Sequence, residues 1–395
     1  MNHRLRARWV WSGTSFVGML VILTASPTAS IRAQEAMPAT RSAGESLNSP
    51  MESFAPVFSL SQAAVALDES ALSWIHLHRC GSCHTTYSYL VARPALKETA
   101  SPALDEVRRF FAERVAHWDD KDKAAKPRWD AEVVSTAEAL ALNDAATTGK
   151  LHPLTRKALD RMWTLQKPEG GFEWLKCGWP PLEHDDYYGA IVAALGVGHA
   201  PDGYAQSPAA KAGLARLRTY FSKNPAPDLH HQTMLLWAST RLDGLMTARE
   251  RSTTIARLRE LQRPDGGWNL ASLGNWKRRD GTPNDPKAPS DGYATGLILF
   301  VLRQAGVSES DPALKRGVGW LMLNQRASGQ WFTRSLNNDK EHYIAHAGTA
   351  FAVLALRACG IIRDGATPRQ ASRSNELPRS SGTATADAVI GRNRP

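Results

Sequence analysis

One segment, IARLRELQRPDGGWN (Ile255–Asn269), combines an amphipathic helical pattern with a glycine turn and a tryptophan. The pattern predicts a helix that ends near Gln262, followed by a tight turn that the two glycines permit. A second apolar segment rich in small residues, DGYATGLILFVLRQAG, begins at Asp291. Together the two segments predict a helical hairpin whose second helix is buried.

The same layout recurs in ALDRMWTLQKPEGGFEW (Ala158–Trp174) and in GVGWLMLNQRASGQWF (Gly317–Phe332). The interval between Gln166 and Gln262 is wide enough for a degenerate copy, which we find in residues 212–242. Two further helix pairs are predicted upstream, in residues 71–96 and 104–142. Six helix pairs of this kind cannot bury their apolar faces alone and must stack on one another.

These Gln-Gly-aromatic segments resemble the QW repeats of squalene–hopene cyclases and related terpene cyclases. The six hairpins also resemble the (α/α)6 toroid shared with protein prenyltransferase β subunits. The resemblance implies an all-α chain with a single (α/α)6 toroid in residues 60–362, whereas full-length cyclases carry two such domains. We expect each Gln to bond free backbone groups at helix ends, and Trp268 and Trp331 to pack between neighbouring pairs.

The two ends of the chain differ from this repeat region. Residues 1–33 read as a signal peptide, with Arg4, Arg6 and Arg8 before an apolar stretch; an uncleaved membrane anchor is the alternative. Residues 34–59 are predicted to be a disordered linker, and residues 363–395 a disordered tail. The sequence thus predicts a periplasmic or secreted protein that meets a membrane only through its signal or peripherally. Much of the net charge of +10 lies at the two ends, so we do not expect nucleic acid as a partner.

The first helix pair contains Cys80-Gly81-Ser82-Cys83-His84, which is the C-x-x-C-H attachment motif of c-type haem. Two thioether bonds would form through Cys80 and Cys83, with His84 as the iron ligand. A zinc site that uses the same three residues, with Cys177 or His184 as the fourth ligand, is one alternative. A disulfide between Cys80 and Cys83, or free thiols, is the other.

The second helices of the pairs all start at one end of the toroid, so their first residues are expected to face one mouth of the cavity. Hydroxyl, carboxylate and imidazole groups would meet there. The predicted mouth residues are Tyr87, His184, His230, His231, Asp291, His342 and His346.

The segment PPLEHDDYYGA (Pro180–Ala190) resembles the D-x-D-D acid motif of class II terpene cyclases, with Glu183 in place of the first Asp. The resemblance implies Asp185 as the proton donor, held protonated by the neighbouring carboxylates of Glu183 and Asp186. A cationic His184 would oppose this protonation. The other interpretation is that Asp185 caps the helix that follows it.

Three functions follow from these features. The first is an exported toroid with a haem c or metal site at the cavity mouth, which binds an apolar or isoprenoid-like ligand and, with a redox partner, has a redox or sensing role. The second is a terpene cyclase-like isomerase with Asp185 as general acid. The third is a non-catalytic binding toroid. If the protein is an enzyme, it is predicted to be terpene cyclase-like or a haem-dependent oxidoreductase.

Overall fold

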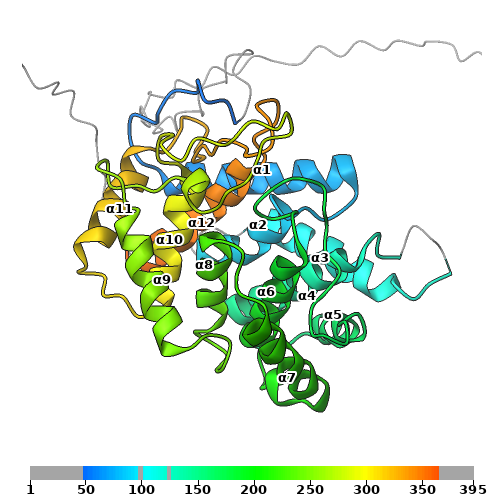
Figure 1. Ribbon diagram of the computed structural model, residues 1–395. Coiled ribbons are helices and arrows are strands. Elements are labelled where there is room, and N and C mark those ends of the chain that lie inside the picture. The colour runs from blue at the N-terminus through cyan, green and yellow to red at the C-terminus, as the bar shows by residue number, and fades with distance from the viewer. Residues whose placement is uncertain (1–47, 97–100, 122–125, 364–395) are drawn as a thin grey trace, which may run out of the picture. The chain divides into compact units, whose positions relative to one another are not determined.

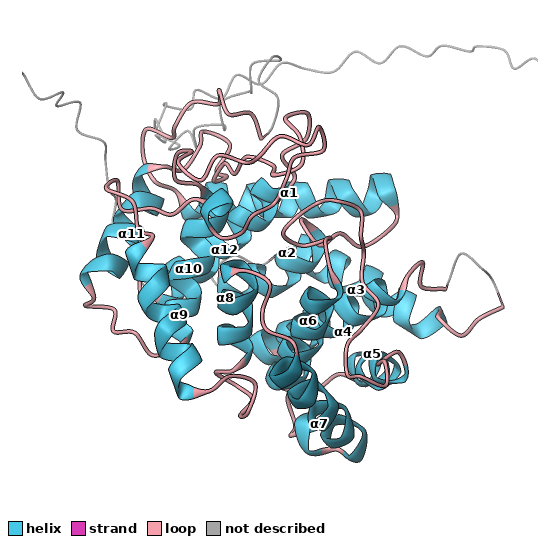
Figure 2. Ribbon diagram, in the orientation of Figure 1, coloured by secondary structure: helices cyan, strands magenta, loops and turns pink. Residues whose placement is uncertain are grey.

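The computed structural model describes residues 48–96, 101–121 and 126–363, all of which lie in the compact unit formed by residues 45–395. The predicted signal peptide, the first part of the predicted linker and the tail from residue 364 lie outside the described residues. The described residues form twelve α-helices and no β-strand (Figure 2). The helices are α1 (Leu60–His78), α2 (Thr86–Ala92), α3 (Pro102–His117), α4 (Asp130–Thr147), α5 (Pro153–Thr164), α6 (Asp186–His199), α7 (Pro208–Lys223), α8 (Leu229–Ala238), α9 (Ala248–Glu260), α10 (Gly292–Gln304), α11 (Pro312–Leu323) and α12 (Ile344–Ala358).

The even-numbered helices form a closed inner ring (Figure 1). Each packs against the next, from α2 through α4, α6, α8 and α10 to α12, and α12 packs back against α2. The odd-numbered helices lie outside this ring. Helices α1, α3, α5 and α11 contact the even-numbered helix of their own pair, whereas α7 and α9 pack mainly against the even-numbered helix that precedes them. This arrangement confirms the predicted (α/α)6 toroid of six helix hairpins.

The inner and outer helices differ in how many of their residues are buried, because the inner helices are apolar on all sides and the outer helices are apolar on one side. In α6, every residue from Tyr187 to Val197 is buried, as expected for a helix that is apolar on all sides. In α9, only Thr254 and Leu258 are buried, so one stripe of the helix contacts the core. The ring also needs small residues where inner helices cross. A Cβ atom at Gly296 of α10 would lie 2.5 Å from the backbone nitrogen of Ala352 in α12.

The repeated glutamines link each pair to the next. The side-chain amide of Gln166 donates to the carbonyl of Gly170 in its own loop and to the carbonyl of Gly213 in α7, at 3.0 and 3.1 Å. Gln262 makes the equivalent pair of bonds to Gly266 and to Ala313 in α11. The Gln side chains therefore bond free carbonyls, as the repeat predicts.

The repeat tryptophans fill the space between neighbouring pairs. Trp268 is fully buried, its indole N–H donates to the Leu258 carbonyl at 2.6 Å, and its ring lies against Gly317 of α11. Trp331 is also fully buried, donates to the Leu321 carbonyl at 2.7 Å and packs near Phe58. Both residues thus connect one pair to the next at the same end of the ring.

The predicted linker needs correction at its second half. Residues 48–59 are ordered against the loop between α11 and α12. The amide N–H of Ala55 donates to the Gln325 carbonyl at 2.8 Å, and the buried carboxylate of Glu52 accepts from the Ser328 N–H at 2.6 Å. Because this segment supplies hydrogen bonds and the buried Phe58 to the last repeat, it belongs to the toroid. None of the helices in the described residues is both long and apolar enough to cross a membrane.

Candidate functional site

Long loops cover one end of the ring (Figure 2). Hydrogen bonds join several of these loops. The loop between α9 and α10 meets the loop between α11 and α12, where the Arg279 N–H donates to the Asn337 carbonyl at 2.9 Å. The side chain of Asn337 in turn donates to the carbonyl of Gly178, in the loop between α5 and α6. These contacts divide the expected single mouth into several separate depressions.

One depression contains the C-x-x-C-H motif, which lies in the loop between α1 and α2. This mouth cavity has a volume of about 280 Å³. Its polar lining includes Cys80, Cys83, His84, Cys177 and Glu183. Its aromatic lining consists of Trp74, Tyr87, Trp129, Trp179 and Tyr343. The structure therefore places the motif, Tyr87 and Cys177 around one cavity, together with Glu183, which the sequence had instead grouped with Asp185 and Asp186.

The His84 side chain is buried in the wall of the mouth cavity. Its Nδ1 atom lies 3.7 Å from a carboxylate oxygen of Glu183. Its Nε2 atom is buried and has no hydrogen-bond partner among the described residues. Burial lowers the pKa of His84, and the Glu183 carboxylate opposes this shift only in part. The described residues therefore leave the buried Nε2 atom of His84 available to a ligand.

The cysteines of the cavity are thiols in this structure, and Cys80, Cys83, Cys177 and Cys359 are all unpaired. Burial raises the pKa of Cys83 well above its usual range, and the negative charge of Glu183 raises it further. Burial and Glu183 also raise the pKa of Cys177. Reactive thiols need a lowered pKa, so these positions do not resemble a thiol–disulfide exchange site.

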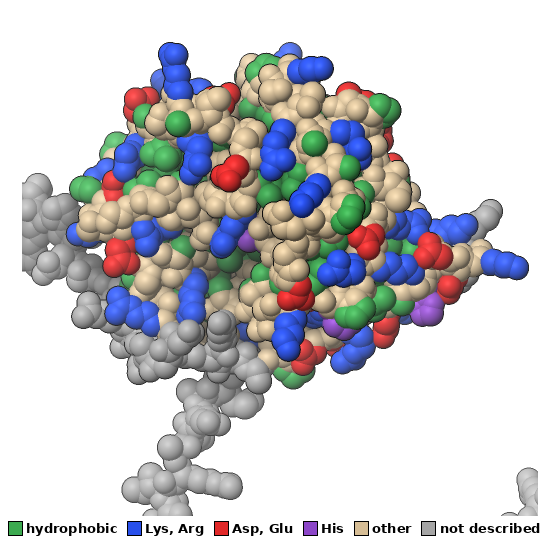
Figure 3. All heavy atoms as spheres, turned by 90° about the horizontal axis from the view of Figure 1, so that it is seen from below, with side chains coloured by type: hydrophobic (Ala, Val, Ile, Leu, Met, Phe, Trp, Pro, Cys, Tyr) green, Lys and Arg blue, Asp and Glu red, His purple; other side chains and the backbone are tan. Residues whose placement is uncertain are grey.

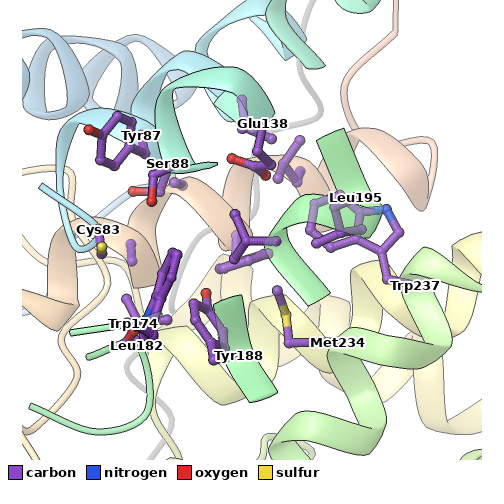
Figure 4. A pocket seen from close by; sticks show the side chains of 17 residues that line it. Cys83, Tyr87, Ser88, Glu138, Trp174, Leu182, Tyr188, Leu195, Met234 and Trp237 are labelled. Atoms are coloured by element: carbon purple, nitrogen blue, oxygen red, sulfur yellow. The ribbon is translucent and has the colours of Figure 1, made fainter. Parts of the chain in front are cut away.

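A second, inner cavity of about 60 Å³ lies at the centre of the ring and shares Cys83, Tyr87 and Ser135 with the mouth cavity. Side chains from α2, α4, α6 and α8 surround it, including Tyr87, Glu138, Tyr188 and Trp237 (Figure 4). Most of the remaining lining is aliphatic or aromatic. The two cavities are therefore neighbours, with Cys83, Tyr87 and Ser135 lying between them.

Among the residues that the structure describes, Glu138 is the only one with a carboxylate side chain in the lining of the inner cavity, and sequence reasoning missed it. The residue is buried in α4, and the structure shows no hydrogen bond or ion pair for its carboxyl group among the described residues. Burial raises the pKa of Glu138 to about 8, so the group is a neutral acid near neutral pH. The available signal was a glutamate within the otherwise apolar inner-helix segment AEALAL, residues 137–142.

Asp185 and Asp186 line a different depression, an open polar one of about 640 Å³ that also contains His184 and Asp228. Asp185 caps α6, where its side chain accepts from the Tyr188 N–H at 3.1 Å. A second carboxylate oxygen of Asp185 lies 3.1 Å from Nε2 of the fully buried His231. Burial alone would raise the pKa of Asp185, but His231 and the Tyr188 N–H outweigh it and lower the pKa below the ordinary value. The structure thus gives Asp185 the capping contacts and an ionised carboxylate.

The other predicted mouth residues are dispersed. Asp291 caps α10 in a third cavity, and burial raises its pKa to about 6. His230 is fully buried and bonds the Tyr293 hydroxyl at 2.9 Å. His342 accepts from the Ser335 N–H at 3.0 Å. His346 lies beside the motif, with Nδ1 3.0 Å from the Thr85 hydroxyl, but lines neither cavity. The expectation of one shared mouth is therefore wrong, because the interlocked loops separate these side chains.

The molecular surface shows no large region of one charge on the face drawn in Figure 3, where basic and acidic side chains are interspersed. Near the Asp185 depression, Lys176 lies 3.2 Å from Asp186 and 3.4 Å from Glu173. Such exposed pairs contribute little to stability.

Comparison with known proteins gives a partial sequence match. No family model matches the chain. Squalene–hopene cyclase from Bradyrhizobium diazoefficiens is 27% identical over 129 residues, which are 31% of this chain and only 17% of the length of that enzyme. The match supports a squalene cyclase-like toroid, and the shared part is a small piece of the cyclase.

Three solved structures resemble the chain at low identity. A possible GH105-family member from Klebsiella pneumoniae has a TM-score of 0.47 at 11% identity and covers 76% of this chain and 93% of its own. The ent-copalyl diphosphate synthase from Streptomyces platensis has a TM-score of 0.46 at 14% identity, and the match covers 70% of this chain and 50% of the synthase chain. A variant of the type II terpene cyclase MstE from Scytonema, bound to geranylgeranyl dihydroxybenzoate, has a TM-score of 0.44 at 13% identity. This match covers 77% of this chain and 99% of the cyclase chain. All three scores lie below 0.5, so the assignment of the ring rests on the helix contacts of this chain.

Proposed function

We propose that this protein is an exported toroid that carries a covalently attached haem at Cys80, Cys83 and His84. In this proposal, the haem lies in the mouth cavity and an apolar or isoprenoid-like ligand binds beside it, with only a small part of the ligand in the inner cavity of about 60 Å³. Bound there, haem would supply one-electron chemistry or ligand sensing at its iron, in exchange with a redox partner.

The observation that carries the proposal is the environment of His84. Its Nε2 atom is buried without a partner, and its Nδ1 atom lies 3.7 Å from the Glu183 carboxylate. Metal-ligating histidines commonly present one nitrogen to the metal while a carboxylate orients the other. Glu183 is therefore assigned as the positioning residue of His84 and not as an acid of a D-x-D-D motif.

The spacing of the donor atoms favours haem over zinc. A zinc ion needs its ligand atoms gathered within bond lengths of about 2.0–2.3 Å. Among the described residues, the Cys80, Cys83, His84 and Cys177 donors do not form a group within 4.8 Å of one another, although they line one cavity. Cys80 and Cys83 would hold a haem through thioether bonds and His84 would ligate its iron, so these three donors need not gather around one ion.

The walls of the cavities suit an apolar ligand. The mouth cavity is lined by Trp74, Trp129 and Trp179, whose flat faces pack well against a conjugated ring system. The inner cavity lies next to it, with Cys83 in the lining of both, and contains the neutral acid of Glu138. A ligand with an apolar body and one hydrogen-bond-accepting oxygen would bury its body among the aromatic side chains and accept a bond from Glu138.

Cyclisation with Asp185 as the acid finds less support in the geometry. A proton donor must be protonated and must face a cavity that shields carbocations from water. Asp185 has a lowered pKa, contacts His231 and lines an open polar depression rather than the apolar inner cavity. No observation on Asp186 favours the acid role either, since its carboxylate pairs with Lys167 and Lys176.

The test is an absorption spectrum of the full chain matured in a periplasm with a haem-ligation system. We expect a red protein with haem bands that shift on reduction, and weaker haem retention after denaturation in Cys83→Ala. Cys359→Ala, which alters a cysteine outside both cavities, is the matched control and should leave the spectrum unchanged. A colourless wild-type protein with one zinc per chain would show that the site binds zinc and not haem. A colourless protein without metal would show that the cysteines are free thiols or form a disulfide.

A further inference from the structure

A second group of potential metal ligands lies at the start of α8, away from the C-x-x-C-H motif. Asp228 precedes the helix, and its Oδ1 atom accepts from the His231 N–H at 2.9 Å. The same oxygen lies 2.8 Å from Nδ1 of His231. His230 and His231 are both fully buried, and the Asp228 side chain is 13% exposed. This cluster of Asp228, His230 and His231 is named the α8 cluster below.

The spacing within the α8 cluster matches a coordination sphere. One ligand atom from each of its three residues lies within 4.8 Å of the other two, and no other group of three among the described residues does so. Ligands bound tetrahedrally at 2.0–2.2 Å lie about 3.4 Å from one another. Small side-chain adjustments would therefore place all three donors on one ion.

Independent support comes from an unpaired nitrogen. The Nδ1 atom of His230 is buried and has no hydrogen-bond partner, whereas its Nε2 atom lies 2.9 Å from the Tyr293 hydroxyl. Its ring is held between Tyr188 and Tyr293, with ring centroids 6.0 and 5.8 Å away. Buried imidazole nitrogens normally have a hydrogen-bond partner, so the unpaired Nδ1 atom of this fixed ring is a position where a ligand can bind.

The second nitrogen of each histidine already has the support that metal-bound imidazoles usually have. His230 uses the Tyr293 hydroxyl, and Nε2 of His231 lies 3.1 Å from a carboxylate oxygen of Asp185. Such partners fix the orientation of the ring and increase its basicity as a ligand. Asp185 therefore acquires a role in orienting His231, in addition to capping α6.

We infer that the α8 cluster binds a first-row divalent transition metal of the Zn²⁺ class. Two imidazoles and one carboxylate suit Zn²⁺ and its neighbours, whereas Mg²⁺ and Ca²⁺ prefer oxygen ligands alone. Asp185 and Asp228 line the open depression of about 640 Å³, which gives the ion access and leaves room for a water ligand. This site is independent of the haem proposal, because it shares no residue with the C-x-x-C-H cavity.

The test uses Co²⁺ as a spectroscopic probe and Zn²⁺ as its competitor, with the full chain after treatment with a chelator. We expect one Co²⁺ per chain, displaced by Zn²⁺, with weak visible bands and no thiolate-to-metal charge-transfer band. The same stoichiometry should be found when Cys80, Cys83 and Cys177 are all replaced by Ser, which separates this site from a cysteine site. A charge-transfer band that disappears in the cysteine variant, with no Co²⁺ left bound, would overturn the inference.

Two variants make the result specific. His230→Gln and Asp228→Asn should each weaken Co²⁺ binding at least about tenfold, the lower end of the usual loss for altered metal sites. Asp228→Asn retains a good helix cap, so that variant should still fold, as its thermal unfolding would show. His184→Gln, in the same depression but outside the cluster, is the matched control and should bind Co²⁺ normally. Equal affinity in the wild-type protein and Asp228→Asn, or no binding by the folded wild-type protein, would show that the cluster is only a charged hydrogen-bond network.

Discussion

Gln325 and Ser59, which are 266 positions apart in the chain, exchange two hydrogen bonds. The Gln325 amide donates to the Ser59 carbonyl at 2.8 Å, and the Ser59 N–H donates to the Gln325 side-chain oxygen at 2.7 Å. The same amide also bonds the Gly329 carbonyl at 3.0 Å. Because Ser59 caps α1, the last repeat is bonded to the start of the first, and the repeat contact closes the ring.

Removal of this contact should destabilise the whole toroid. In Gln325→Ala, the part-buried Ser59 N–H and the buried Gly329 carbonyl lose the Gln325 side chain as a partner, at a cost of about 1–3 kcal/mol. Urea unfolding would measure this loss. Gln62→Ala, which changes an exposed glutamine on α1, is the control and should stay within about 0.5 kcal/mol of the wild type. Equal stabilities of the two variants would show that Gln325 does not close the ring.

Trp268 should contribute more than Gln325 to the free energy of unfolding, because it is fully buried between two helix pairs. Trp268→Ala is expected to lower the free energy of unfolding by about 3–5 kcal/mol, as large aromatic truncations in cores do. Trp129, which is 56% exposed, provides the comparison, and its replacement by Ala should cost much less. Thermal unfolding at the wild-type temperature in Trp268→Ala would refute the packing role.

Glu138 should make the stability of the protein depend on pH. Burial raises its pKa to about 8 in the folded protein, above the ordinary value of about 4.5. The folded state therefore keeps the proton in a range where the unfolded state releases it, so stability falls as pH rises from about 5 to about 8. Each pKa unit corresponds to about 1.4 kcal/mol.

The measurement compares Glu138→Gln with the wild type in chemical unfolding at several pH values. The variant should lose the part of the downward slope that Glu138 contributes, which alone extends to about pH 8, and should gain stability relative to the wild type as pH rises; the smaller contribution of Asp291, whose pKa is raised to about 6, remains in both proteins. Glu169→Gln, an exposed change in the loop between α5 and α6, should keep the wild-type slope. Parallel curves for Glu138→Gln and the wild type would show that this carboxyl group is not held neutral in the cavity.

Asp185 should behave as a cap and a partner of His231 rather than as a proton donor. Asp185→Ala is expected to cost about 0.5–2 kcal/mol, the usual loss for an N-cap, and Asp185→Asn less than that. Incubation of the wild-type protein with squalene and shorter polyprenyl substrates should give no cyclised lipid. A cyclised product whose formation falls about 10²–10⁴-fold in Asp185→Asn would instead establish the general-acid role.

The repeat pattern predicted the fold because the pattern depends on residues that are close to one another in the sequence. Gln262, the glycine turn and Trp268 lie within a few residues, and each repeat carries the same contacts to the next. The pattern also placed the C-x-x-C-H motif in the loop between α1 and α2 and brought Cys177 near it. These features follow from helix lengths and from the common direction of the inner helices.

The division of the cavity mouth could not be predicted in this way. It depends on contacts between loops far apart in sequence, such as the Asn337 side chain and the Gly178 carbonyl. The ionisation of Asp185 depends on His231 from another helix pair, and the burial of Glu138 depends on the whole ring. A sequence motif shows which carboxylates are close to one another along the chain. It does not show which side chains from other helices will contact them in the folded protein.

The most direct test of the haem proposal is the intact mass of the mature full chain under denaturing conditions, after maturation in a periplasm with a haem-ligation system. We predict one species with the mass of the polypeptide plus one haem, because thioether bonds survive denaturation. His84→Ala, which keeps both cysteines, should still show covalent haem but with altered bands in the native spectrum. The bare polypeptide mass for the wild-type protein, matured beside a c-type cytochrome that does acquire its haem, would contradict the proposal.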